Sequence, residues 1–243
     1  MAKQKIGVFD SGVGGLTVYR QIKKNSNLQV IYFGDTKRAP YGSKGNETLK
    51  KYGFQIVSFL ESLGCTAFTV ACNTLSSNVT FDREVISLIE HGSKEALRKT
   101  KGGNIGLFAT EATVRSKAFH KHIKGLKAVA CPEFVPLIEA GEINSDSIVS
   151  AVKNRLLQLG SIDTLILGCT HYPLIEEVIK TLTDAVIIDP AVPSISSINL
   201  KADDENCEED NDDEFYVSGD PEEFENFFKK IFGYEIKAKR HIL

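Results

Sequence analysis

The sequence has no long apolar run and no cluster of basic residues, and each absence excludes a class of protein. No apolar stretch approaches the roughly 18 residues that a membrane-spanning helix needs. The N-terminal MAKQKIGVFD enters a β-strand pattern without the apolar segment of a signal peptide. We therefore expect a cytoplasmic protein with no membrane partner.

The cysteines are few and unpaired. Their number is odd and no C-x-x-C pair occurs, which favours reduced thiols over a disulfide framework and gives no structural zinc spacing. We therefore predict no metal site. The five cysteines are Cys65, Cys72, Cys131, Cys169 and Cys207. A single cysteine in such a sequence is more often a small buried apolar residue than a catalyst. Cys65, Cys131 and Cys207 are interpreted that way or as loop thiols.

The net charge is −3, and one segment accounts for its sign. DDENCEEDNDDE, residues 203–214, holds nine of the 32 acidic residues, so 23 acidic and 29 basic residues remain elsewhere. That mild basic excess is scattered, without interleaved aromatic residues, so nucleic-acid binding is not indicated. The acidic run is predicted to be a solvated, flexible loop over residues 203–213.

Short β-branched runs alternate with longer amphipathic ones, which is typical of parallel sheets wrapped by helices. A strand is also expected at FYVS near the C-terminus. Asn46 is predicted to cap the helix that stops at Gly64, Ser145 the helix running to Gly160, and Asp220 the last helix. The other predicted strands are 6–9, 30–33, 67–71, 105–108, 128–131, 165–167 and 186–188.

The sequence contains an internal echo. IGVFDSGVGG at residue 6 is answered by IGLFATEATV at 105, and TVACNT at 69 by ILGCTH at 166, with offsets of 99 and 97. The near-identical offsets predict two similar α/β lobes, each a mainly parallel sheet flanked by helices, related by pseudo-two-fold symmetry. The C-terminal strand and helix are expected to return to the first lobe. The predicted domains are 1–94 plus 214–243, and 95–202.

Cys72 and Cys169 each follow a predicted strand and precede a predicted helix. Ligands of parallel sheets bind at the carboxyl ends of strands, so both thiols are predicted at that edge. A helix start also lowers the pKa of a thiol from about 8.5 toward neutrality, and its free N–H groups can receive a carboxylate. These N–H groups would be those of Asn73, Thr74, Thr170 and His171.

Two such lobes facing each other would place one thiol on each side of a small chiral molecule. One thiolate could remove an α-proton while the opposite thiol returns a proton to the other face. This arrangement suits a reaction whose substrate and product are mirror images.

Other polar residues have ordinary interpretations beside functional ones. FDSGVGG lacks the lysine of a phosphate-binding P-loop, and its glycines more simply form a tight turn. GDTKRAPYGSKG, residues 34–45, is either a surface loop or a loop that covers a substrate. Taken alone, Glu139 would be a solvated helix carboxylate and His171 a cap residue.

Several motifs, taken together, resemble the cofactor-independent aspartate/glutamate racemase superfamily and, within it, the bacterial glutamate racemases. The resemblance runs nearly end to end and implies that Cys72 and Cys169 are the two bases. It implies that Asp10, Glu139 and His171 assist them. The motifs are IGVFDSGVGGLTV, YFGDTKRAPYGSKG, ACNT, CPEFVPLIEAGE, LILGCTHYPLI and FYVSGDPEEF.

The resemblance also implies the substrate, its contacts and the assembly. It implies a cytoplasmic, commonly dimeric enzyme that makes D-glutamate for peptidoglycan, an isomerase that needs no cofactor. Departures occur at Leu75, Ala109 and IDPAVPS, none of which touches the two cysteines. The substrate contacts implied are Asp10, Ser11, Tyr41, Gly42, Asn73, Thr74, Thr170 and His171.

Three alternatives stay open from the sequence. The lobes could belong to an aspartate or other amino-acid racemase, or to a decarboxylase or isomerase of the same superfamily. A non-catalytic protein with this fold could bind a small acid or a protein partner. Cys169 and His171 could also form a hydrolytic nucleophile pair, although residues two apart at such a junction need not touch and no oxyanion-loop motif stands out.

Overall fold

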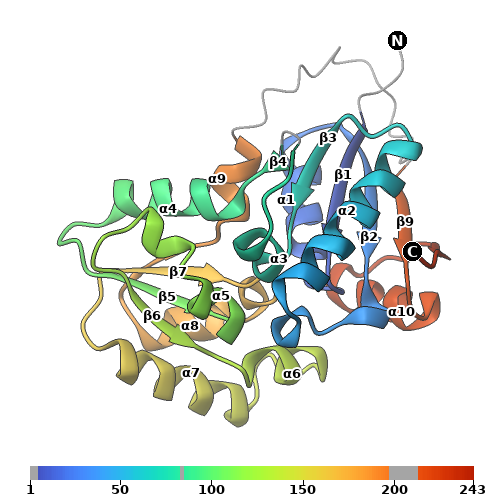
Figure 1. Ribbon diagram of the computed structural model, residues 1–243. Helices are drawn as coiled ribbons and strands as arrows, with labels where there is room; N and C mark the ends of the chain where they lie inside the picture. The colour runs from blue at the N-terminus through green and yellow to red at the C-terminus, as the bar shows by residue number, and fades with distance from the viewer. Residues whose placement is uncertain (1–4, 83–84, 197–212) are drawn as a thin grey trace.

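The computed structural model describes residues 5–82, 85–196 and 213–243, which form two α/β lobes lying side by side (Figure 1). The first sheet has the strand order β10-β9-β2-β1-β3-β4 and the second the order β6-β5-β7-β8. Neighbouring strands are parallel throughout both sheets. The predicted pair of mainly parallel sheets flanked by helices is therefore confirmed.

The strands follow the predicted β-branched runs to within a residue or two. Two short edge strands, β4 and β10, were not predicted. β4 has only two residues, and β10 has two exposed charged residues, Lys239 and Arg240, so neither gives an apolar strand pattern. The strands of the first sheet are β1 Lys5–Asp10, β2 Gln29–Gly34, β3 Ala67–Val70, β4 Val85–Ile86, β9 Glu214–Val217 and β10 Ala238–Arg240. Those of the second are β5 Ile105–Ala109, β6 Lys127–Ala130, β7 Thr164–Gly168 and β8 Val186–Ile188.

Helices cover both faces of each sheet. The α-helices are α1 Leu16–Asn25, α2 Asn46–Ser62, α3 Asn73–Asn78, α4 Leu88–Lys99, α5 Glu111–Ser116, α6 Phe134–Glu139, α7 Asp146–Leu159, α8 Glu176–Leu182, α9 Ala191–Ser196 and α10 Pro221–Phe232. Four short 3-10 turns are η1 Thr36–Arg38, η2 Tyr41–Ser43, η3 Phe119–Lys121 and η4 Tyr172–Ile175. No helix in the described part of the chain is long and apolar enough to cross a membrane.

The helix caps follow the sequence in two of three predicted places. Ser145 Oγ accepts from the Ile148 N–H, and Asp220 Oδ1 accepts from the Glu222 N–H. The prediction for Asn46 is wrong, because Asn46 is the first residue inside α2 and Gly45 occupies the cap position without a side-chain hydrogen bond.

Alternating side chains give each sheet an apolar cluster on either face. In β1, Ile6 and Val8 pack on one side and Phe9 on the other. In β7, Leu165 and Leu167 pack on one side and Ile166 on the other. Strands buried on both faces form near-continuous apolar runs, which explains why these runs were easy to recognise in the sequence.

The internal echo corresponds to a repeated topology. The order β2-β1-β3-β4 in the first sheet matches β6-β5-β7-β8 in the second, strand for strand along the chain. The echoed pairs are therefore β1 with β5 and β3 with β7, the two central strands of each lobe. Because both sheets have the same connectivity, the carboxyl ends of equivalent strands carry equivalent loops.

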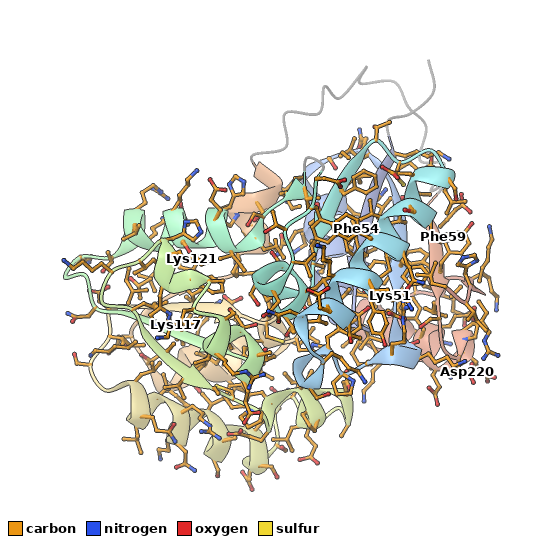
Figure 2. All side chains as sticks on the ribbon, in the orientation of Figure 1. Lys51, Phe54, Phe59, Lys117, Lys121 and Asp220 are labelled. Atoms are coloured by element: carbon orange, nitrogen blue, oxygen red, sulfur yellow. The ribbon has the colours of Figure 1, made fainter. Side chains whose placement is uncertain are left out.

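The C-terminal segment joins the first sheet through β9, which pairs with β2, while β10 extends the edge beyond it. Phe59 of α2, labelled in Figure 2, stacks on His241 with ring centroids 3.8 Å apart. The domain boundary expected after residue 94 falls inside α4, which packs against β7, β8 and α9. The boundaries themselves stay a prediction, and most of the acidic segment, with Cys207, lies outside the described residues.

Candidate functional site

A cavity of about 490 Å³ opens where the carboxyl ends of the two sets of strands meet. The segments that follow β1, β2 and β3 form one wall, and those that follow β5, β6 and β7 form the other. This is the edge at which parallel sheets bind ligands. The lining residues are Ser11, Gly12, Ala39, Pro40, Tyr41, Gly42, Ser43, Cys72, Asn73, Thr74, Thr110, Glu111, Cys131, Pro132, Val135, Pro136, Glu139, Cys169, Thr170 and His171.

All of the site residues expected from the sequence line this cavity except Asp10. They come from both lobes, so neither sheet alone could form the site. The two thiols expected to face each other, Cys72 after β3 and Cys169 after β7, contribute to one cavity from opposite lobes. That Cys72 and Cys169 share the cavity is the central observation about this site.

Cys72 is the N-cap residue of α3 and is 5% exposed. Its thiol donates to Ser11 Oγ at 3.6 Å. Burial and the nearby charge of Asp10 raise the pKa of Cys72 to about 12, although hydrogen bonds from Leu75 and Ser11 act in the opposite direction. The expected fall of this pKa toward neutrality is therefore wrong, because a six-residue helix cannot outweigh burial beside a carboxylate.

Cys169 has a different setting. Its Sγ lies 3.8 Å from His171 Nδ1, and His171 Nε2 lies 3.0 Å from Glu139 Oε1, so the three groups form a chain. Burial lowers the pKa of His171, but its contacts with Cys169 and Glu139 and the charge of Asp10 outweigh burial and raise it to about 10. The raised pKa favours the protonated imidazole, which lies between a sulfur and a carboxylate.

Asp10 lies behind the cavity wall and is 1% exposed. Its carboxylate accepts from the Gly12 N–H at 2.8 Å and from Thr170 Oγ1 at 3.2 Å. Burial raises the pKa of Asp10, against the charge of His171 and these hydrogen bonds. Thr17 Oγ1 donates to the Thr170 carbonyl at 2.9 Å, so the junction that carries Cys169 is held by the first lobe at two points.

The Tyr41 side chain contributes no free hydroxyl to the cavity. Tyr41 is 1% exposed and its OH donates to the carboxylate of Asp35, which is itself fully buried. The main chain of Tyr41 and Gly42 is therefore the part of this loop that a ligand can reach. The loop expected either to lie on the surface or to cover the substrate supplies Ala39 to Ser43 of the lining.

Asn73 provides a polar group without a protein partner. Its Oδ1 is buried and accepts no hydrogen bond from the described residues. A buried carbonyl oxygen without a donor costs about 1–3 kcal/mol unless a ligand or water supplies one. Asn73 lines the cavity, so a ligand N–H group placed there would remove that cost.

Several lining residues were not predicted from the sequence, although one sequence signal points to two of them. Thr110 and Glu111 lie 99 positions after Ser11 and Gly12, the offset of the internal echo. The Thr110 hydroxyl meets that of Thr74 at 3.0 Å across the two lobes. Cys131, interpreted as an apolar filler or a loop thiol, is fully buried but touches the cavity.

Among the described residues, the lining has acidic groups in Glu111 and Glu139 but no lysine or arginine side chain. An anionic ligand would therefore be held by main-chain N–H groups, hydroxyls and His171, whose raised pKa favours its charged form. Within the described ranges there is no group of three or more His, Cys, Asp or Glu residues that could hold a metal ion. The chemistry available is proton transfer between two thiols, one of them backed by an imidazolium.

Comparisons with known proteins agree with this geometry. Residues 6–196 match the model of the Asp/Glu/Hydantoin racemase family. Glutamate racemase 2 of Caldanaerobacter subterraneus subsp. tengcongensis is 38% identical, over 97% of this chain and 96% of its own length. The similarity to this relative therefore extends over nearly the whole length of the chain.

Solved structures extend the similarity to three dimensions. Glutamate racemase isoform RacE1 from Bacillus anthracis superposes with a TM-score of 0.90 at 33% identity, covering 99% of this chain and 98% of that one. The glutamate racemase from Francisella tularensis subsp. tularensis SCHU S4, solved in complex with D-glutamate, gives a TM-score of 0.85 at 31% identity, covering 99% and 97%.

Proposed function

The chain belongs to the Asp/Glu/Hydantoin racemase family, and we propose that it is a glutamate racemase that interconverts L- and D-glutamate with Cys72 and Cys169 as its two bases. The observation that carries the proposal is that these thiols, from equivalent strand ends of two similar lobes, line one cavity. Full-length similarity to glutamate racemases supports glutamate over aspartate as the substrate.

We assign substrate recognition to polar groups of both lobes. The junctions after β3 and β7 present main-chain N–H groups in first helical turns, where no intrahelical partner exists, and these suit the carboxylates. The unpartnered Oδ1 of Asn73 suits the α-ammonium group. The residues assigned are Ser11, Tyr41, Gly42, Asn73, Thr74, Thr170 and His171, all in the lining, with Asp10 acting from behind it.

The two thiols have different surroundings. Burial and the charge of Asp10 raise the pKa of Cys72, which favours its thiol form, whereas His171 Nδ1 lies 3.8 Å from the Cys169 sulfur. We therefore assign Cys169 as the base that takes the α-proton of L-glutamate and Cys72 as the acid that delivers a proton to the opposite face. One C–H bond breaks, one forms, and the thiol and thiolate exchange places.

The reverse reaction uses Cys72 as the base. D-glutamate must lose its α-proton to Cys72, whose thiol has to be ionised first. The α-ammonium group brings a positive charge into the cavity, and a positive charge favours the thiolate. The negative charge of Asp10 raises the pKa of both Cys72 and His171, so we assign Asp10 to influence the protonation of these two groups.

The decisive experiment is incubation of the purified protein with L-glutamate in D₂O. Racemisation with deuterium at the α-carbon is expected, because the returning proton comes from an exchanged thiol. Activity should survive EDTA and hydroxylamine and be abolished by thiol alkylation, since no cofactor is assigned. Hydrolysis of a supplied substrate, or binding without exchange, would instead favour a nucleophilic Cys169–His171 pair or a non-catalytic protein.

We also propose that the protein acts in the cytoplasm as a homodimer and supplies D-glutamate for peptidoglycan. The family supports these assignments, and the described residues contain no membrane-spanning helix. Light scattering after size-exclusion chromatography would test the assembly, with a monomer mass of 26.7 kDa as the reference.

A further inference from the structure

The carboxylate of Asp35 lies at the centre of a buried network that touches the loop over the cavity. Asp35 follows β2 directly and is fully buried, although it does not line the cavity. Its Oδ2 accepts from Arg38 Nε at 2.5 Å and from the Tyr41 hydroxyl, and its Oδ1 accepts from Ser218 Oγ at 2.6 Å. Three side-chain donors thus converge on one side chain.

Two of these donors come from the loop itself. Arg38 ends η1 and Tyr41 begins η2, so the two contacts bracket the turn that leads to the lining residues Ala39 and Pro40. Since the Tyr41 hydroxyl is committed to Asp35, the position of the Tyr41–Gly42 main chain in the cavity depends on that hydrogen bond.

The third donor comes from the C-terminal segment. Ser218 follows β9, and its N–H donates to the Gly34 carbonyl at 3.0 Å, which places it beside Asp35. Its hydroxyl also accepts from the Lys37 N–H at 3.0 Å, while the Gly219 N–H donates to Thr36 Oγ1 at 3.0 Å. The C-terminal segment therefore makes two further hydrogen bonds to the loop.

Two nitrogens of the Arg38 guanidinium, Nε and Nη1, donate within the network, while its buried Nη2 has no hydrogen-bond partner among the described residues. Arg38 Nη1 donates to Gln55 Oε1 at 2.8 Å, and its guanidinium lies 3.9 Å over the Tyr52 ring, both on α2. Arg38 is absent from the cavity lining. A cation in a loop beside an anion-binding cavity would suggest a carboxylate contact, but its contacts here join the loop to Asp35 and α2.

We propose that Asp35 is a positioning residue for the substrate-covering loop, and that Ser218 completes its setting from the C-terminal segment. The inference rests on the proposed racemase function. Asp35 acts through Tyr41 and Arg38, which hold the Tyr41–Gly42 main chain where it contacts substrate. Displacement of a positioning group by about 1 Å can cost on the order of a hundredfold in rate. Disturbing the network should therefore lower kcat/KM.

The test compares Asp35→Asn with Asp213→Asn. Asp213 is a matched control: its side chain is 1% exposed, and it also accepts from a tyrosine, Tyr19, and from a cation, Lys23, but at a place remote from the cavity lining. Kinetics with each enantiomer of glutamate, and protection of the thiols from iodoacetamide by D-glutamate, give KM and affinity separately. Circular dichroism checks folding.

Asp35→Asn should raise KM for both enantiomers by about tenfold or more, with a smaller fall in kcat, and weaken D-glutamate protection in parallel. Asp213→Asn should leave both within about twofold. If Asp35→Asn does not fold, Tyr41→Phe and Ser218→Ala decide, since each removes one donor and keeps Asp35; both should raise KM by about threefold or more. In folded Asp35→Asn, adding Tyr41→Phe should cost less than it does alone, because the two residues share one interaction.

The outcomes separate the inference from the function on which it rests. Racemisation by the unaltered chain, with KM of Asp35→Asn within twofold of that of Asp213→Asn, overturns the positioning role alone. The positioning role is likewise overturned if Asp35→Asn does not fold and neither Tyr41→Phe nor Ser218→Ala changes KM. No racemisation by the unaltered chain refutes the proposed function, and the positioning role with it.

Discussion

Thr170 Oγ1 donates to Asp10 Oδ2 at 3.2 Å, so the residue that follows Cys169 is hydrogen-bonded to a carboxylate that raises the pKa of Cys72. Asp10 raises the pKa of Cys72, and its negative charge also raises that of His171 beside Cys169. One buried carboxylate therefore influences the protonation of both halves of the site. The two lobes are thus joined at the site by a hydrogen bond and by the charge of Asp10.

The two-base arrangement predicts separable half-reactions. Cys72→Ser and Cys169→Ser should each abolish racemisation, because a full turnover needs a base on one face and an acid on the other. With a glutamate analogue that carries a β-leaving group, elimination needs only one proton to be removed. Cys72→Ser should therefore process only the L-enantiomer and Cys169→Ser only the D-enantiomer.

The measurement for the two cysteine variants is the elimination rate for each enantiomer, with circular dichroism to confirm folding. The same enantiomer preference in both variants would refute two facing bases. A single cysteine working with water or His171 would leave one variant active on both enantiomers.

Glu139→Gln should affect the Cys169 half of the site. Its carboxylate helps to raise the pKa of His171 to about 10, so removing the charge lowers that pKa. The imidazolium is present below its pKa and is lost as pH rises through it, so the alkaline limb of kcat/KM should move to lower pH. A fall of about tenfold or more in kcat for L-glutamate is expected.

Glu142→Gln is the matched control for this pH profile. Glu142 lies three residues further on, accepts from Ser145 Oγ at 3.0 Å and does not line the cavity. An unchanged alkaline limb in Glu139→Gln would show that the His171–Glu139 contact has no role in the chemistry.

Asp189→Asn should stabilise the protein at neutral pH. Burial raises the pKa of Asp189 to about 6, and the charge of Glu176 adds to it. A raised pKa in the folded state means that stability is fully present below the unfolded value and is lost as pH rises through about 6. Asparagine keeps the acceptor for the Ala191 N–H at 3.0 Å without the charge.

The expected gain for Asp189→Asn is about 1 kcal/mol at pH 8, reduced for partial solvent exposure, and close to zero near pH 4. Urea unfolding at the two pH values measures it, with the exposed Asp184→Asn as the control. A gain of equal size at both pH values would mean that removal of the charge is not its cause.

The acidic segment is predicted to be dispensable for the chemistry. Its charge density is typical of a solvated loop, and Cys207 is assigned no role. Replacing residues 203–212 by a short Gly/Ser linker should leave kcat within a few-fold, because loop-length changes cost little. The linker must keep Asp213, which accepts from the Val30 N–H at 2.8 Å and from Tyr19 at 2.9 Å. Collapse of activity in a folded variant would contradict this.

Much of the fold was readable from the sequence for a simple reason. Central parallel strands are buried on both faces, so the middle parts of β1 and β7 are near-continuous apolar runs. The repeat offset predicted two similar α/β lobes, and the structure shows that the lobes share a strand order. Strands β4 and β10 were not predicted, because β4 has only two residues and β10 has two exposed charged residues and so lacks an apolar run.

For the site, the sequence identified the two candidate bases, because local order alone places Cys72 and Cys169 at strand ends followed by helical turns. Only the tertiary structure decided what surrounds each thiol. Burial beside Asp10, from another strand, raises the pKa of Cys72, and α6 brings Glu139 to His171. Desolvation and long-range charge depend on what packs around a group, and a linear sequence does not contain that information.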